Sequence, residues 1–210
     1  MSFNVNVSKN LGGAHVGATF LTDGGLTVLS GTSGAGKTSV LNMIAGLLRP
    51  DRGYVRVGDV TLFDAAENVD MPVHHRRLGY VFQDGRLFPH RRVRANLLYG
   101  YRLAQPEHRW IGVDEVVGFL GIGALMDRWP RSLSGGEAQR VAIGRALLSG
   151  PRALLMDEPL ASLDPARRGE IMDVILRIRD ELKLPILYVT HDTVEAIKLA
   201  SHRVDIIRLK

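Results

Sequence analysis

The chain has 210 residues, of which 45% are hydrophobic and 23% charged. This fits one globular unit with a sizeable core and excludes two full domains. The absence of cysteine excludes disulfides and thiolate chemistry. No apolar run approaches the roughly 20 residues of a membrane-spanning helix, and residues 1–6 lack the pattern of a signal peptide. Any membrane partner is therefore expected to be a separate subunit.

The net charge is +5, and basic residues gather in residues 74–77 and 90–94. Such clusters form either a solvated face or a surface that attracts nucleic acid or anionic lipid. No aromatic platform or groove-reading helix accompanies them. Nucleic-acid binding is therefore not expected.

In chain order, residues 26–29 predict a short buried strand, followed by a glycine-rich turn and a helix from about Lys37. The apolar positions of that helix are Val40, Leu41, Ile44, Leu47 and Leu48. Pro50 and Gly53 are expected to end it. Residues 53–63 alternate apolar with polar residues and predict a small antiparallel sheet.

The turn before this helix reads GTSGAGKT and matches a phosphate-binding loop between a strand and a helix. Backbone N–H groups freed by the glycines can surround phosphate oxygens. Lys37 can supply charge to the β- and γ-phosphates, and the Thr38 hydroxyl can bind Mg²⁺. An ordinary glycine-rich turn is the alternative. The predicted ATP contacts are Gly31, Thr32, Ser33, Gly34, Ala35, Gly36, Lys37 and Thr38.

The second half continues the pattern. Residues 84–149 are mostly helical, residues 153–156 predict a buried strand, and Asp164 caps a helix with Pro165 in its first position. Strands at 186–189 and 204–207 enclose a helix at 193–200. This alternation predicts a parallel sheet covered on both faces.

Two carboxylates follow the strand at 153–156. Asp157 can hold Mg²⁺ directly or through water, and Glu158 can orient and deprotonate an attacking water. The alternative is an acidic pair that only closes a strand. The phosphate-binding loop elsewhere in the chain favours the catalytic interpretation.

Residues 133–140 read LSGGEAQR, which resembles the signature motif of ATP-binding cassette (ABC) ATPases. The resemblance covers most of the chain and implies ATP and Mg²⁺ as ligands. It also implies an α/β fold: a P-loop NTPase (RecA-like) core with a small antiparallel β subdomain, at 1–83 and 150–210, and an inserted helical subdomain at about 84–149. It further implies a homodimer. In that dimer, Ser134, Gly135, Gly136 and Glu137 of one copy hold the γ-phosphate bound to the other.

The same resemblance implies three further roles. Gln83 would reach the Mg²⁺ and the attacking water, and His191 would be the switch histidine that contacts the γ-phosphate. Asp164 lies in a loop, residues 159–164, that crosses the dimer interface in this family. Taken singly, these would be a surface glutamine, a structural histidine and a helix cap.

Residues 79–100 are similar to the coupling region of bacterial import ATPases, most of all those of molybdate importers. This implies an ATPase on the cytoplasmic face of the bacterial inner membrane. Two integral membrane permease subunits would dock near Gln83 and Leu87–Pro89, and a substrate-binding protein would act indirectly. Sulfate, ferric iron and polyamine are alternative cargoes. A soluble ABC ATPase acting on DNA or ribosomes is a third interpretation, but the chain has neither a long coiled coil nor a second cassette.

Overall fold

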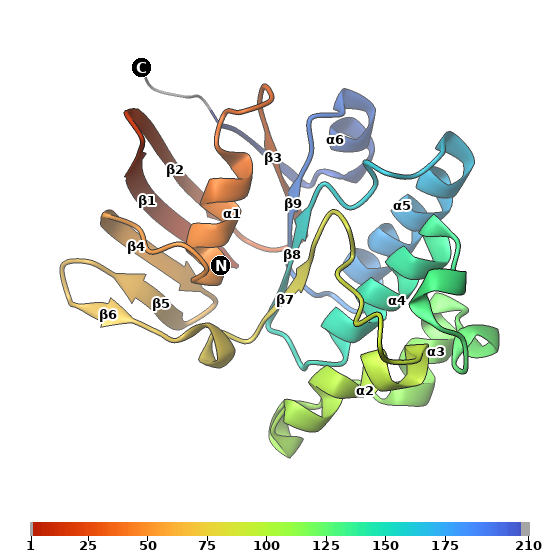
Figure 1. Ribbon diagram of the computed structural model, residues 1–210. Helices are drawn as coiled ribbons and strands as arrows, with labels where there is room; N and C mark the ends of the chain where they lie inside the picture. The colour runs from red at the N-terminus through yellow and green to blue at the C-terminus, as the bar shows by residue number, and fades with distance from the viewer. Residues whose placement is uncertain (1, 207–210) are drawn as a thin grey trace.

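A parallel five-stranded sheet forms the centre of the computed structural model, which describes residues 2–206 (Figure 1). The strand order is β10-β3-β9-β8-β7. The strands are β3 (Leu26–Ser30), β7 (Leu78–Val81), β8 (Ala153–Asp157), β9 (Ile186–Val189) and β10 (His202–Asp205). Every residue of β3 and β9 is buried, as expected for a parallel sheet covered on both faces. The last strand begins two residues before the predicted 204–207, and residue 207 lies outside the described residues.

A second, antiparallel sheet has the order β2-β1-β4-β5-β6. Its strands are β1 (Phe3–Leu11), β2 (Ala14–Thr22), β4 (Arg52–Val57), β5 (Val60–Asp64) and β6 (Val69–Asp70). The prediction of strands at 53–63 is confirmed, but the β1–β2 hairpin was not predicted. A period-two signal was present, because Phe3, Val5 and Val7 are buried while the polar residues between them are not.

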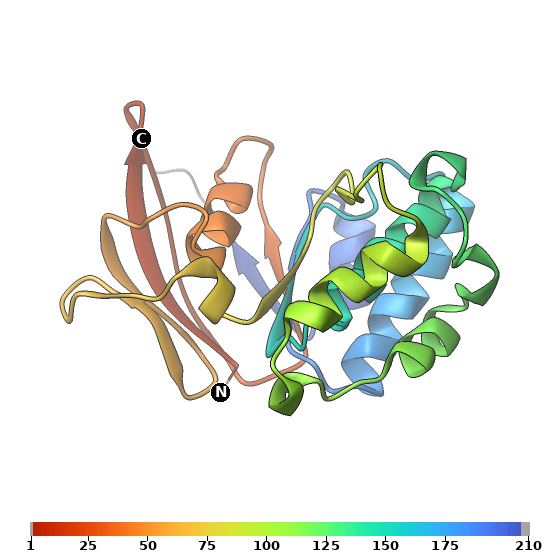
Figure 2. The ribbon, with the colours of Figure 1, turned by 60° about the horizontal axis from the view of Figure 1, so that its bottom comes forward.

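Helix α1 (Lys37–Ala45) lies between the two sheets (Figure 2). It begins at Lys37 as predicted, and Val40, Leu41 and Ile44 are buried. The prediction that it extends to Pro50 was wrong. Gly46 adopts a left-handed conformation with φ 81°, and the next amide, that of Leu47, donates to the carbonyl of Asn42. This is a glycine helix stop, and it leaves Leu47 52% exposed.

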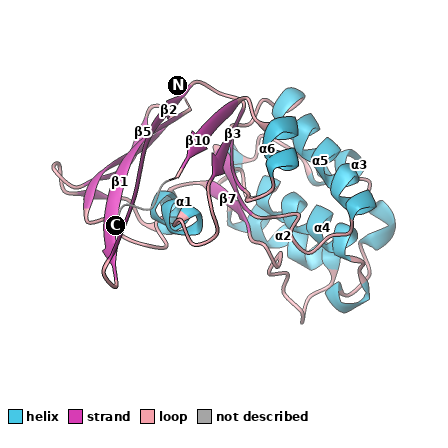
Figure 3. Ribbon diagram, turned by 90° about the horizontal axis from the view of Figure 1, so that it is seen from above, coloured by secondary structure: helices cyan, strands magenta, loops and turns pink. Residues whose placement is uncertain are grey.

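The other face of the parallel sheet is covered by helices (Figure 3). These are α2 (Val93–Leu103), α3 (Val113–Leu120), α4 (Gly135–Leu147), α5 (Pro165–Asp180) and α6 (Thr193–Leu199), with short 3₁₀ turns at Val73–His75, Pro106–His108, Gly123–Leu125 and Pro130–Ser132. The sheet thus separates two hydrophobic cores, one around α1 and one among these helices. Within residues 2–206, no helix has the length and apolarity to cross a membrane.

A buried arginine, Arg76, fastens the end of α1 to the strands beside it. Its side chain is 1% exposed. The guanidinium donates to the carbonyls of Met43 (3.2 Å), Ile44 (2.8 Å) and Met71 (2.8 Å), and to Asp70 Oδ1 (3.0 Å). The carbonyls of Met43 and Ile44 belong to the last turn of α1, where the regular pattern of helix hydrogen bonds ends, and the Met43 carbonyl also accepts from the amide of Gly46 at 3.2 Å. Arg76 therefore completes the C-terminal end of this helix.

We expect Arg76→Met to destabilise the fold by about 3 kcal/mol, because it removes the guanidinium donor from the buried carbonyl of Ile44 and from that of Met71 and breaks the pair with Asp70. Urea unfolding followed by circular dichroism measures the change. Arg49→Met is the matched control, since Arg49 also pairs with Asp70, at 3.3 Å, but is 70% exposed. The control should lose less than about 1 kcal/mol. Equal losses in the two variants would contradict the role given to Arg76.

Candidate functional site

The phosphate-binding loop joins β3 to α1. Gly34 and Gly36 have φ of 77° and 97°, a region that favours glycine. A Cβ at Gly36 would also lie 2.4 Å from Cγ1 of Val16 on β2. Gly36 is therefore required both by its backbone conformation and by the close approach of the antiparallel sheet. Thr32, Ser33 and Gly34 are exposed and accessible to a ligand.

Lys37 is folded inward over this loop. Its side chain is buried, and Nζ donates to the carbonyls of Gly31 (2.8 Å) and Thr32 (3.0 Å). A buried ammonium group is costly unless it is fully paired. The loop thus holds a cation beside the amide groups that follow Gly31, and phosphate oxygens would replace these carbonyls as its partners.

Thr38, in the first turn of α1, meets Asp157 at the end of β8. Thr38 Oγ1 donates to Asp157 Oδ1 at 2.9 Å. A hydroxyl and a carboxylate this close are the hard oxygen ligands that suit Mg²⁺, which usually completes its shell with water and phosphate oxygens. Burial raises the pKa of Asp157, and the neighbouring charge of Glu158 adds to the rise. The oxygen atoms of Thr38 and Asp157, both predicted as metal ligands, therefore fit a Mg²⁺ ion.

Tyr80, on β7, is a member of this cluster that sequence reasoning missed. Its hydroxyl lies 3.0 Å from Asn42 Oδ1 and 3.4 Å from Asp157 Oδ2. Burial and the nearby charge of Asp157 raise the pKa of Tyr80, so its hydroxyl stays a donor. The available signal was weak, because an aromatic residue in a strand is usually a core residue.

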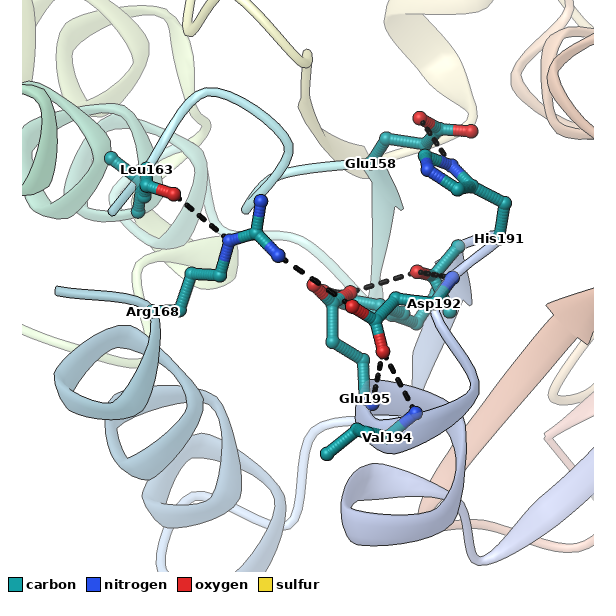
Figure 4. Close-up of polar contacts among 9 residues, drawn as sticks. Glu158, Leu163, Arg168, His191, Asp192, Val194 and Glu195 are labelled. Carbon is teal, nitrogen blue, oxygen red and sulfur yellow. Dashed lines mark hydrogen bonds and ion pairs between the residues drawn. The ribbon is translucent and has the colours of Figure 1, made fainter. Parts of the chain in front are cut away.

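Glu158 and His191 follow the ends of two adjacent parallel strands. Asp157 on β8 is in register with Val189 on β9, and the amide of Glu158 donates to the carbonyl of Val189 at 3.0 Å. His191 Nδ1 lies 3.0 Å from Glu158 Oε2 (Figure 4). Glu158 has φ 43°, a strained conformation for a non-glycine residue. The fold thus brings these two predicted catalytic residues into contact.

Gln83 lies in an exposed turn after β7. Within the described chain, its side chain makes no hydrogen bond to Asp157, Glu158 or His191. The segment after it is attached to helix α4, because Arg145 donates to the carbonyls of Gly85 (2.9 Å) and Arg86 (2.7 Å). Gln83 is therefore connected to the helices as well as to the parallel sheet.

The signature residues form the start of α4. The Ser134 hydroxyl accepts from the amide of Glu137, and Glu137 Oε2 accepts from the amide of Ser134 at 2.7 Å, which is a capping box. Gly135 and Gly136 form the first turn, and a Cβ on Gly135 would lie 2.9 Å from Leu163 Cδ2. Helices α4 and α1 lie on opposite faces of the parallel sheet (Figures 1 and 2). The signature residues therefore do not meet the phosphate-binding loop of their own copy.

Asp164 caps α5, as predicted. Its Oδ1 accepts from the amide of Arg167 at 3.1 Å, and Pro165 occupies the first helical position. Leu163, the residue before it, lies against the start of α4. The loop that contains Asp164 is thus placed beside the signature residues.

A family model described as ABC transporter matches residues 19–161. The chain belongs to the ABC transporter family. It is 53% identical over 201 residues to the molybdenum import ATP-binding protein ModC of Mesorhizobium japonicum, covering 96% of this chain and 54% of the relative. The corresponding protein of Rhodospirillum rubrum is 52% identical, with 94% and 53% covered. The chain spans about half the length of these relatives.

Solved structures agree with the fold. The cbiO1 structure from Clostridium perfringens, part of an ABC transporter complex, has a TM-score of 0.81 and 26% identity, with 99% of this chain and 86% of that chain covered. A dimeric ATP-binding cassette in a post-hydrolysis state, bound to ADP and Pi, has a TM-score of 0.75 and 26% identity, with 97% and 92% covered. The predicted α/β fold with a P-loop NTPase core is therefore confirmed.

Proposed function

We propose that this ABC protein is the ATP-hydrolysing subunit of a bacterial molybdate importer. The observation that carries the ATPase assignment is the contact between Glu158 and His191, at the same sheet edge as the Thr38–Asp157 pair. The cargo is supported by identity of 52–53% to two molybdenum import ATP-binding proteins.

In this proposal, the loop amides of residues 31–36 and the ammonium group of Lys37 bind the ATP phosphates. Thr38 and Asp157 hold Mg²⁺, which when bound neutralises phosphate charge. Glu158 accepts the proton of the attacking water, and its contact with His191 orients its carboxylate. Gln83 reaches the site when the helical part moves toward the parallel sheet.

The assembly we propose contains two copies of the ATPase. Because the signature residues and the phosphate-binding loop are on opposite faces of one copy, a second copy is needed to place Ser134–Glu137 on the γ-phosphate. The loop with Asp164 would cross that interface. Two membrane permease subunits would dock near Gln83 and Leu87–Pro89 on the cytoplasmic side of the membrane. A substrate-binding protein would deliver the cargo, and nucleic acid has no part in this function.

The test is uptake of labelled molybdate at low external concentration by source cells that lack this protein. Wild-type protein should restore uptake, and Lys37→Ala should not. Uptake of sulfate and ferric iron is measured in the same cells. Restoration of one of those cargoes in place of molybdate would overturn the molybdate assignment and retain the ATPase. Failure of the purified protein to hydrolyse ATP with Mg²⁺ would overturn both.

A further inference from the structure

Arg168 connects two loops of the site that are far apart in the sequence. It lies in the first turns of α5, just after the loop with Asp164. Its Nε donates to the carbonyl of Leu163 at 2.9 Å, and its guanidinium pairs with Asp192 Oδ2 at 3.5 Å. Figure 4 shows Arg168 extending from α5 toward the segment that carries His191. One side chain thus joins the loop at residues 159–164, here called the dimer loop, to residues 190–192, here called the switch loop.

Hydrogen bonds hold Asp192 at the end of this connection beside His191. Asp192 Oδ1 accepts from the amides of Val194 (2.7 Å) and Glu195 (3.2 Å) and so caps α6. Glu195 is itself buried and accepts from the hydroxyls of Tyr188 and Thr190, both at 2.8 Å. Because the amides of Val194 and Glu195 hold the Asp192 carboxylate, a displacement of Arg168 would act on the backbone beside His191.

The connection also borders the catalytic pair. A hollow of about 50 Å³ lies between this connection and the catalytic pair. Its lining includes Arg168, Asp192, Glu158 and His191. Arg168 and Asp192 are both about one-third exposed. Because neither side chain is enclosed by the core, the distance between Arg168 and Asp192 can change when the dimer loop moves, without unfolding of the core.

We propose that Arg168 is a positioning residue for His191. Its bonds to Leu163 and Asp192, here termed the Arg168 bridge, make the position of the Glu158–His191 pair depend on the position of the dimer loop. This inference rests on the proposed ATPase function. A second copy that presses on the loop at residues 159–164 would thereby move Arg168 and, with it, the segment that holds His191 against Glu158.

A double-mutant cycle tests the bridge in the purified ATPase. Arg168→Met removes both contacts, and Asp192→Asn removes the ion pair while keeping a side-chain oxygen that can cap α6. We expect each variant to lower kcat about tenfold and the double variant to fall no further, because both remove one coupling. KM for ATP and ATP-dependent dimerisation should stay unchanged. Arg177→Met, which breaks a pair with Glu181 on the same helix and a bond to the carbonyl of Phe119 but touches neither Leu163 nor Asp192, should have wild-type activity.

Unchanged kcat in Arg168→Met, or losses that multiply in the double variant, would overturn the proposal. A parallel loss of ATP binding would instead indicate general damage and also count against it. The second measurement is independent of hydrolysis: the NMR signal of the His191 ring, assigned with His191→Ala, should move in Arg168→Met and stay in Arg177→Met. An unmoved signal contradicts the bridge. If the wild type fails to hydrolyse ATP, the proposed function fails, and the NMR result alone decides the bridge.

Discussion

Glu158→Gln should bind ATP as the wild type does and hydrolyse it at least about 100-fold more slowly, the usual contribution of a general base. Glutamine has nearly the same shape and keeps an oxygen that can face Nδ1 of His191, which lies 3.0 Å from the Glu158 carboxylate. It cannot accept a proton from water at neutral pH. The nucleotide should therefore be bound and not turned over, and the variant should accumulate as an ATP-dependent dimer. Phosphate release and size-exclusion chromatography with ATP measure the two effects.

Glu170→Gln is the control for this substitution. Glu170 is 62% exposed and pairs with Arg140 at 2.7 Å, and this pair includes neither Glu158 nor His191. It should hydrolyse ATP normally and remain monomeric under the same conditions. Normal turnover in Glu158→Gln would remove Glu158 from its assigned role, and loss of ATP binding would mean that the residue maintains the site itself.

Ser134→Arg should block hydrolysis about 100-fold or more while leaving the ATP affinity of the single copy within about twofold, because the change removes a transition-state contact supplied by the second copy. Ser134 is the cap of α4, and α4 lies on the face of the parallel sheet opposite α1. A bulky cation there cannot obstruct the phosphate-binding loop of its own copy. Isothermal titration with ATP and a phosphate-release assay give the two quantities.

Loss of the helix cap has to be separated from this effect. Ser134→Ala removes the acceptor for the amide of Glu137 and should cost about 1 kcal/mol of stability. Each change is also placed in the Glu158→Gln protein. Ser134→Arg should prevent the ATP-dependent dimer, and Ser134→Ala should allow it. A dimer that persists with Ser134→Arg, or ATP affinity that falls in the single copy, would contradict binding by the second copy.

Several elements of the fold were predictable because their causes are local. The strand at residues 26–29, the loop that follows and the start of α1 at Lys37 are specified by an apolar run, glycines and a lysine within a dozen residues. The same holds for α5, where Asp164 and Pro165 mark the start. The strand at residues 3–11 has a comparable alternation but was not predicted, and the predicted end of α1 was wrong because Gly46 stops the helix.

The candidate site was predictable as a set of residues but not as an arrangement. Motifs at residues 31–38, 157–158 and 191 identify groups suited to phosphate and water chemistry from their residue types and the strand ends they follow. The register of β8 with β9 then decides that Glu158 and His191 are in contact. The register is set by the pairing of strands over the whole sheet. It therefore cannot be predicted from the residues of one short segment.

Sequence motifs alone therefore determined the family, the phosphate-binding loop and the candidate catalytic groups, because each depends on neighbouring residues and their types. The tertiary structure determined three things that depend on residues far apart in the chain. It placed Tyr80 beside Asp157, it joined Leu163 to Asp192 through Arg168, and it put α4, which Ser134 caps, on the face of the sheet opposite α1, which begins at Lys37. These contacts depend on how the buried surfaces pack. Packing brings together side chains that are far apart in the sequence, and no local pattern predicts such pairs.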